Sequence, residues 1–202
     1  MGVPAPARRP IATRQRAAQA DRRRAELIDA ALRLFAERGF RGTTIADIAA
    51  ATGTAHGLVY HYFRSKDELL DAILERYSFL PQLRALLAVS PDRPAGDVLN
   101  EVAVGFSRLL DERPELLRLV VTESQTNPIV AAALARITDE GLVVLTEYLR
   151  ARIAAGELRL HDPTVPARAL FWAIITKHLG PPGVDGFETD LVAVLLDGIR
   201  AS

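Results

Sequence analysis

The sequence predicts an all-α fold of about nine helices, and two observations support this. Apolar residues recur every three or four positions along most of the 202-residue chain, which is the spacing of one buried helix face. A proline or a polar capping residue stands at the start of most of these segments, as is typical of helix N-termini. No alternating run of β-branched residues indicates a strand. Because 49% of the residues are apolar, the chain can form one ordinary core or two small ones.

Residues 1–20 contain three prolines and four arginines but few large apolar side chains, so we predict a disordered basic arm there. The first helix is expected to begin at Asp21 and to carry Leu27 and Phe35 on its apolar stripe. It ends before Gly39, because glycine adopts the left-handed conformation at a helix end without steric cost. Whether the arginines of the arm contact an adjacent minor groove or remain solvated is left open.

Two short helices follow. Thr44 and Asp47 have the spacing of a capping box, which predicts a second helix over about 44–51 that closes at Gly53. A third helix is predicted over about 55–62.

A second capping box, from Ser65 to Glu68, starts a fourth helix that extends to near Leu80, where Pro81 kinks or ends it. The strongest loop signal is the glycine- and proline-rich segment 180–186. The remaining helices are predicted at 95–112, 114–125, 128–155, 164–179 and 187–200.

Charge is distributed unevenly, although the formal net charge is zero. Residues 1–66 hold twelve Lys and Arg against five Asp and Glu, whereas residues 67–202 hold thirteen against twenty. Such an asymmetry favours an N-terminal segment that binds a polyanion, followed by an acidic remainder of the chain. Chance clustering of charges on solvated faces is the alternative.

Composition also limits the environment of the protein. The chain has no cysteine, which excludes disulfides and thiolate metal sites and fits a reducing compartment. The apolar stretch 169–175, which no other apolar run exceeds in length, is too short to span a bilayer, and no apolar run of a secretory signal follows the basic N-terminus. We therefore predict a cytoplasmic protein without a membrane partner.

The second and third predicted helices, joined by a glycine turn, have the pattern of a helix-turn-helix. Such a motif places its second helix in the major groove, where residues near the helix N-terminus reach base edges. The predicted helix at 55–62 is short and carries small, aromatic and basic side chains, which suits a groove that accepts one helix. The sequence therefore predicts double-stranded DNA as a partner.

The region over about 24–70 carries glycines, paired threonines, aromatics and a Ser-Lys pair at regular spacing, namely Gly39, Thr43, Thr44, Ile48, Ala49, Gly53, Gly57, Tyr60, Phe63, Ser65, Lys66 and Leu69. This pattern resembles the TetR family of transcriptional repressors. The resemblance implies a helix-turn-helix domain at 21–66 and a helical effector-binding and dimerisation domain at 67–202. The chain departs from the family at Thr54-Ala55, where the family has Val-Ser, and at Leu58, where a hydroxyl is frequent.

The predicted DNA contacts lie around the third helix. Lys66 offers a cation to a phosphate, and Leu58 can contact a thymine methyl. Thr54 is expected to cap the helix one residue early, since Ala55 has no side-chain oxygen. The predicted DNA-binding residues are Thr43, Thr44, Thr54, Ala55, His56, Gly57, Leu58, Tyr60, His61 and Lys66, with a core position left open for Tyr60.

The resemblance also implies that the last two helices form a four-helix bundle with a second subunit. The sequence supports this independently, because segment 169–175 is apolar nearly all round and the last helix has an apolar stripe. A partner subunit is expected to cover both; burial within one subunit is the alternative. The stripe consists of Leu191, Val194, Leu195 and Ile199. A dimer would place two DNA-reading helices about 34 Å apart, on successive major grooves of a palindrome.

An effector pocket should be mostly apolar with a few placed polar groups. The cluster Thr122–Gln125 is the best candidate for a polar lining; a structural hydrogen bond or a surface position is the alternative for each of its residues. Few charges interrupt the apolar helices, which favours an uncharged, lipophilic effector. By the resemblance, effector binding changes the tilt of the fourth helix. The predicted ligand-binding residues are Phe79, Leu83, Phe106, Leu110, Val121, Thr122, Ser124, Gln125, Trp172 and Thr176.

The sequence disfavours other classes of function. The four histidines have no metal-ligand spacing, and the chain shows no nucleophile elbow, phosphate-binding loop or catalytic triad. We therefore predict no enzyme, no catalytic residue, no metal site and no cofactor. A helix-turn-helix DNA binder without ligand sensing, and an activator rather than a repressor, remain open.

Overall fold

The structure, a computed structural model, describes residues 9–88, 93–181 and 185–198. Within these ranges it contains ten helices and no strand, which confirms the all-α fold. None of these helices combines the length and the apolar character that a membrane crossing requires. The chain forms two compact units, Met1–Ile73 and Leu74–Ser202. The border between the two units lies inside the fourth helix.

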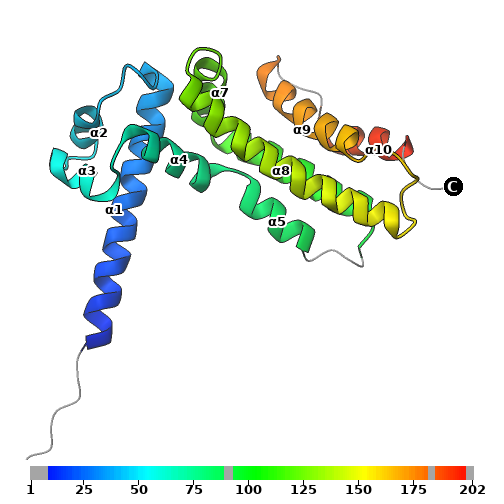
Figure 1. The fold of residues 1–202 in the computed structure, drawn as a ribbon, viewed down its shortest axis with the longest axis horizontal. Helices are drawn as coiled ribbons and strands as arrows, with labels where there is room; N and C mark the ends of the chain where they lie inside the picture. The colour runs from blue at the N-terminus through cyan, green and yellow to red at the C-terminus, as the bar shows by residue number, and fades with distance from the viewer. Residues whose placement is uncertain (1–8, 89–92, 182–184, 199–202) are drawn as a thin grey trace, which may run out of the picture. The chain divides into compact units, whose positions relative to one another are not determined.

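The first unit consists of α1 (Arg9–Arg38), α2 (Ile45–Ala51), α3 (His56–Tyr62) and most of α4 (Lys66–Tyr77) (Figure 1). Helix α2 packs against both α1 and α3. All four helices contribute apolar side chains to one core, whose largest fully buried members are Leu27, Ile28, Phe35, Ile48, Val59, Phe63, Leu69, Leu70 and Ile73.

Helix α1 begins at Arg9 and not at Asp21. The structure thus corrects the prediction of a disordered arm from Arg9 onward, while residues 1–8 lie outside the described residues. Alanine, arginine and glutamine, which are strong helix formers, dominate the segment after Pro10, and no further proline interrupts it. Side chains 14–19 are exposed, so this part of α1 is held by helix propensity and by its continuation into the packed part.

Local caps set the ends of the helices in the first unit. Asp47 N donates to Thr44 Oγ1 (3.1 Å), and Thr44 N donates to Asp47 Oδ2 (2.8 Å), which confirms the predicted capping box. Hydrogen bonds from the Thr44 side chain and backbone hold the pKa of Asp47 below its usual value. Gly39 has a φ of 78°, and the following Phe40 ring folds back to 5.0 Å from the Phe35 ring.

The second predicted capping box forms in a modified way. Glu68 N donates to Ser65 Oγ (3.1 Å), as expected. The Glu68 carboxylate, however, accepts from Arg64 N (2.7 Å) instead of Ser65 N.

The second unit consists of α5 (Leu80–Ala88), α6 (Ala95–Glu112), α7 (Pro114–Glu123), α8 (Pro128–Ala154), α9 (Thr164–Leu179) and α10 (Phe187–Asp197). Helix α6 is central, because it packs against α5, α7, α9 and α10, while α8 packs against α5, α7 and α9. The buried core between them includes Val98, Val102, Ala103, Leu145, Leu149, Leu170, Ile174, Val192 and Leu196.

Helix α5 was not predicted. Pro81 lies in the first turn of α5, where its missing N–H breaks no intrahelical hydrogen bond. The proline therefore opens a new helix, and the fourth helix ends at Tyr77.

A polar cluster joins α6, α9 and α10. Lys177 Nζ donates to Glu188 Oε1 (2.5 Å) and to Ser107 Oγ (3.2 Å). Burial raises the pKa of Glu188, but hydrogen bonds from Lys177 and Ser107 outweigh burial and bring the pKa below its usual value. An unpaired charge in this mostly buried environment is costly. The cluster therefore fixes how α9 and α10 lie against α6.

Candidate DNA-binding surface and ligand cavity

Helix α3 presents nearly all of its side chains to solvent. Val59 is fully buried in the core of the first unit, and this one anchor determines which face of the helix is turned outward. Tyr60 is 48% exposed, so it is a surface residue and not part of the core. Its ring lies 5.2 Å from the ring of His56, edge to face. The exposed residues are Ala55, His56, Gly57, Leu58, Tyr60 and His61.

The turn before α3 differs from the prediction. Gly53 adopts a φ of 61°, which a side chain would disfavour. Thr54 Oγ1 forms a hydrogen bond with Thr52 Oγ1 (3.0 Å), and Ala55 is the N-cap residue without a side-chain hydrogen bond. The expected capping by Thr54 is therefore wrong, because its hydroxyl is engaged within the turn.

Thr43 and Thr44 have structural roles. Thr43 is fully buried, and its hydroxyl lies 3.1 Å from Leu34 O and 3.0 Å from Gly39 O. The structure thus corrects its predicted contact with DNA, since a buried side chain cannot reach a phosphate. Thr44 is exposed, but its hydroxyl donates to Asp47 Oδ2 (2.5 Å).

Lys66 has a role that sequence reasoning missed. Its Nζ donates to Phe40 O and to Thr43 O, both at 2.8 Å, and lies 4.7 Å from the centre of the Phe40 ring. Lys66 therefore ties the α1–α2 connection to the start of α4. An ammonium group has three N–H donors, so one donor remains for a further acceptor.

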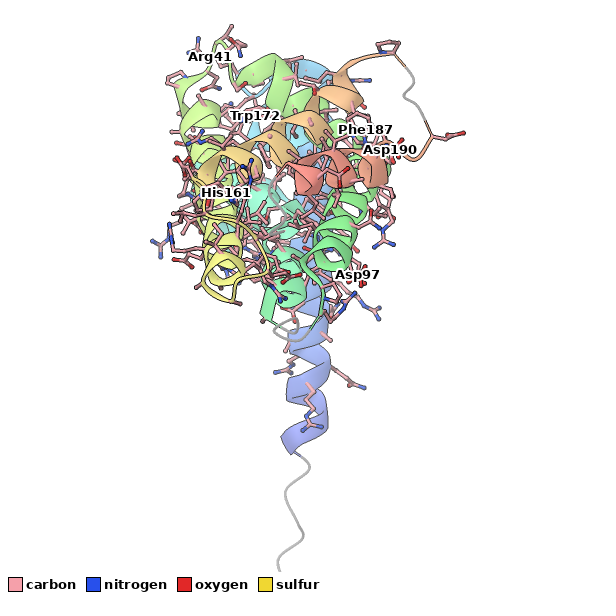
Figure 2. The ribbon with its side chains drawn as sticks, turned by 90° about the vertical axis from the view of Figure 1, so that its right-hand side faces the viewer. Arg41, Asp97, His161, Trp172, Phe187 and Asp190 are labelled. Carbon is pink, nitrogen blue, oxygen red and sulfur yellow. The ribbon has the colours of Figure 1, made fainter. Side chains whose placement is uncertain are left out.

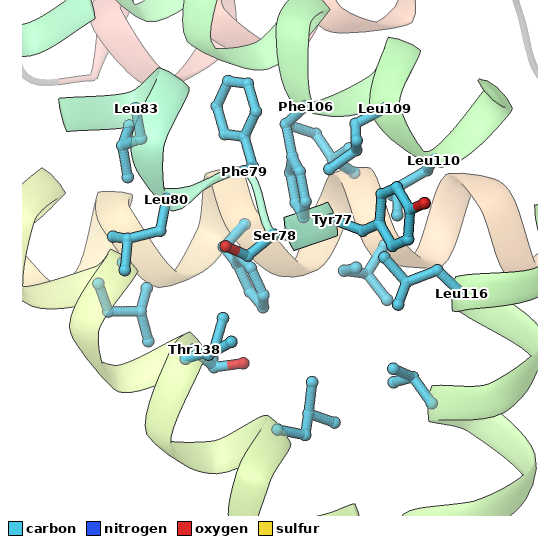
Figure 3. Close-up of a pocket in the computed structure, with 18 of the residues that line it drawn as sticks. Tyr77, Ser78, Phe79, Leu80, Leu83, Phe106, Leu109, Leu110, Leu116 and Thr138 are labelled. Carbon is cyan, nitrogen blue, oxygen red and sulfur yellow. The ribbon is translucent and has the colours of Figure 1, made fainter. Parts of the chain in front are cut away.

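The second unit contains a cavity of about 120 Å³ (Figure 3). Its walls come from the end of α4, from α5 to α9 and from the segment between α4 and α5, and no charged side chain of the part that the structure describes lines it. Three phenylalanine rings form part of one wall: Phe106 lies 5.5 Å from Phe79 and 5.2 Å from Phe171 between ring centres. The remaining apolar lining is mainly leucine, isoleucine and valine.

Only part of the predicted ligand set lines this cavity. Phe79, Leu83, Phe106 and Leu110 do so. On α7 the cavity is lined by Leu116, Leu117 and Val120, and not by the residues Thr122–Gln125 that were predicted as a polar lining. The residues that do not line the cavity are Val121, Thr122, Ser124, Gln125, Trp172 and Thr176.

Helix α8 contributes lining residues that were not predicted. Leu134, Ile137, Thr138, Gly141 and Leu145 line the cavity, and they follow the three- and four-residue spacing of one helix face. That spacing could have identified them. The polar atoms of the lining side chains are hydroxyls, from Tyr77, Ser78 and Thr138.

Helix α9 exposes a row of apolar side chains at seven-residue spacing. Val165 is 64% exposed, Trp172 49% and Leu179 51%, and residues seven apart lie on one helix face. Val194 of α10 is 71% exposed. Figure 2 labels Trp172 on α9, the helix that packs against α10. Within the predicted stripe of α10, Leu191 and Leu195 are half-buried, and Ile199 lies outside the described residues.

Both units match known protein families. Residues 27–73 match the family described as "Bacterial regulatory proteins, tetR family". Residues 97–191 match "AefR-like transcriptional repressor, C-terminal domain".

Curated relatives have matching descriptions. The HTH-type transcriptional repressor KstR2 of Rhodococcus jostii is 40% identical over 118 residues, which are 58% of this chain and 50% of KstR2. The HTH-type transcriptional repressor NicS of Pseudomonas putida is 29% identical over 148 residues, which are 71% of this chain and 69% of NicS. The matched part of the chain thus spans about half the length of KstR2 from R. jostii.

Solved structures have the same fold. Salmonella enterica GusR superposes with a TM-score of 0.73 at 24% identity, over 86% of this chain and 93% of GusR. The ketosteroid transcriptional regulator KstR2 of Mycobacterium tuberculosis superposes with a TM-score of 0.63 at 24% identity, over 89% of this chain and 96% of KstR2. The two family matches, together with the curated relatives, show that the chain belongs to the TetR family of bacterial transcriptional regulators, which are not enzymes.

Proposed function

We propose that the protein is a repressor that binds a palindromic operator as a homodimer, with α3 in the major groove, and that a small molecule releases it. The exposure of α3 is the observation that carries this proposal. A helix with a single fully buried anchor, Val59, and small, aromatic and imidazole groups on its outer surface fits a groove that admits one helix.

The proposed DNA contacts are those predicted residues that are at least partly exposed. His56 and Leu58, near the N-terminus of α3, are proposed to meet base edges, while Tyr60, His61 and Lys66 are proposed to meet phosphates. Thr44, Thr54, Ala55 and Gly57 complete the proposed surface. The first unit would then be the DNA-binding domain, and a cytoplasmic location would give it access to DNA.

The proposed dimer forms through α9 and α10. Isolated exposed apolar residues are common on protein surfaces, but the α9 row places three large ones on one face, with Val194 on the neighbouring helix. A second copy with the same row would cover it by two-fold symmetry. Replacement of Trp172 by glutamate should therefore give a folded monomer in sedimentation experiments. A monomeric wild-type protein at working concentrations would contradict the proposed dimer.

The proposed effector site is the cavity of the second unit. Ligand binding can release DNA only if the ligand has different affinities for the DNA-bound and the free conformations. Effector release therefore predicts that operator DNA lowers the affinity for the ligand by the same factor as the ligand lowers the affinity for DNA.

Selection of bound duplexes from a random pool tests the DNA-binding proposal. A preferred palindrome is expected, and its affinity should fall steeply with salt. Lys66→Met should reduce the slope of log affinity against log salt by about 0.9, whereas Arg84→Gln, which removes an exposed cation from α5, should leave it unchanged. Circular dichroism would verify that both variants fold. Absence of any preferred duplex over genomic competitor would refute the proposal.

Sequence preference gives an independent test of α3. His56→Ala and Leu58→Ala should change which bases are selected, since these side chains are proposed to read base edges. An unchanged selected sequence would remove both residues from base readout. A reporter gene behind the selected operator would distinguish repression from activation, because deletion of the regulator raises expression only under repression.

A further inference from the structure

Two hydroxyl groups of the cavity lining lack a partner within the described part of the chain. Ser78, between α4 and α5, and Thr138, on α8, line the cavity, and neither side chain has a hydrogen bond. Figure 3 shows the Thr138 hydroxyl directed toward the inside of the cavity. The third lining hydroxyl differs, because Tyr77 accepts a hydrogen bond from Arg76 Nε (3.2 Å). Ser78 and Thr138 are thus the lining hydroxyls that a ligand can engage without breaking an existing bond.

The rest of the lining excludes a charged group from the cavity. Among the described residues, no Asp, Glu, Lys, Arg or His side chain lines it. A carboxylate or an ammonium group would lose its hydration there without gaining an ion-pair partner, which is strongly unfavourable. A ligand inside the cavity must therefore be neutral.

The hydroxyls also limit the number of polar groups on the ligand. A pure hydrocarbon would leave both hydroxyls without a partner and would exclude water from them. A molecule with many hydroxyls would bury polar groups against the phenylalanine wall with nothing to bond to. Each unmatched buried polar group reduces affinity. One oxygen, or two neighbouring ones, fits the lining best, and a hydroxyl side chain can pair with a carbonyl or with an alcohol because it both donates and accepts.

We infer that the cavity binds a neutral, largely apolar molecule with a single ketone or alcohol oxygen, which forms hydrogen bonds with Thr138 and Ser78. The inference rests on the proposed function in taking this cavity as the effector site. The cavity volume, about 120 Å³, is below the range of about 300–1,000 Å³ usual for drug-sized ligands. A compact ligand therefore fits directly, and a larger one must displace lining side chains such as Phe79.

Calorimetric titration of the full-length protein tests the inference with matched skeletons. Cyclohexane and decalin skeletons would each be used as hydrocarbon, alcohol, ketone and carboxylate. The alcohol or ketone of at least one skeleton should bind about tenfold or more tightly than its hydrocarbon, and the carboxylate should not bind. Thr138→Val keeps the shape of the side chain and removes the hydroxyl. This variant, or Ser78→Ala, should weaken binding of the oxygenated ligand about 3- to 10-fold without weakening hydrocarbon binding.

Thr122→Val is the matched control, because Thr122 is exposed and its hydroxyl bonds to Arg118 O; it should bind every ligand like the wild type. Binding of a carboxylate as tight as that of its ketone would overturn the inference. So would unchanged ketone affinity in both cavity variants, or the failure of every neutral oxygenated ligand to bind. Adding the same ligands to the complex of the protein with operator DNA tests the effector role of the cavity separately from the chemical class of its ligand. Binding without release of DNA would refute the effector role and leave the ligand class standing.

Discussion

Replacement of Thr43 by valine tests whether this residue supports the fold or contacts DNA. Valine has nearly the shape of threonine, so the substitution removes only the hydroxyl. That hydroxyl is fully buried and lies within hydrogen-bonding distance of Leu34 O and Gly39 O. A threonine hydroxyl has one hydrogen, so the variant loses the equivalent of one buried hydrogen bond and leaves a carbonyl oxygen less well paired.

The expected cost in unfolding free energy is about 1–3 kcal/mol, the range for a buried group that loses its partner. Because the chain has two compact units, the effect should be sought in the first unit. Native-state hydrogen exchange of the buried amides between Leu27 and Ile73 measures it directly. In DNA-binding assays under conditions where the variant is folded, the salt dependence should equal that of the wild type, since no phosphate contact is lost.

Tyr60→Phe should leave the stability of the first unit unchanged and weaken DNA binding, which is the opposite of the result expected for Thr43→Val. Tyr60 is exposed and has no role in the core, so hydrogen exchange in the first unit should stay within about 0.5 kcal/mol of the wild type, while affinity for DNA should fall. If Thr43→Val instead kept full protection in hydrogen exchange and lost affinity for DNA, the assignment of Thr43 to the fold would be refuted.

Three further outcomes are expected. Ala55→Ser should stabilise α3 by about 1 kcal/mol in chemical denaturation, because Ala55 is the N-cap residue and makes no side-chain cap; an unchanged stability would show that the serine cannot adopt the capping geometry. Because folding lowers the pKa of Asp47 from 3.8, its contribution to stability is present above about pH 4 and is lost as the pH falls below the folded-state pKa. The difference in unfolding free energy between the wild type and Asp47→Asn should therefore shrink on acidification, and a constant difference would argue against the capping bond with Thr44. Glu188→Gln should cost about 1–3 kcal/mol in urea denaturation, since it weakens the bond from Lys177 in a mostly buried place, and Lys177→Met should remove most of that cost from the double variant.

Several local features could be predicted from the sequence because neighbouring residues create them. The capping box of Thr44 and the left-handed Gly39 depend only on side chains and backbone within a few positions, and both form as expected. The start of α5 at Leu80 was missed, because Pro81 is compatible both with the end of one helix and with the first turn of another. Local sequence does not decide between them.

Local sequence also does not determine which residues line the cavity, because the lining comes from helices that are distant in sequence. Phe79, Leu83, Phe106 and Leu110 were predicted from their apolar character, but apolar residues are abundant in every helix of the second unit. Thr122 was predicted as lining and is exposed, whereas Thr138 lines the cavity. Both are threonines in helices, and only the packing of α7 and α8 against other helices determines which of them faces inward.

The sequence by itself determined the all-helical class, most helix boundaries and the TetR resemblance, because caps, spacing and glycine turns act within a few residues along the chain. The tertiary structure decided that Thr43 is buried, that Lys66 binds the carbonyls of the α1–α2 connection and that Thr138 reaches the cavity. These three facts depend on elements that are distant in sequence or on the rotation of a packed helix about its axis. Only the close packing of the core fixes such relations.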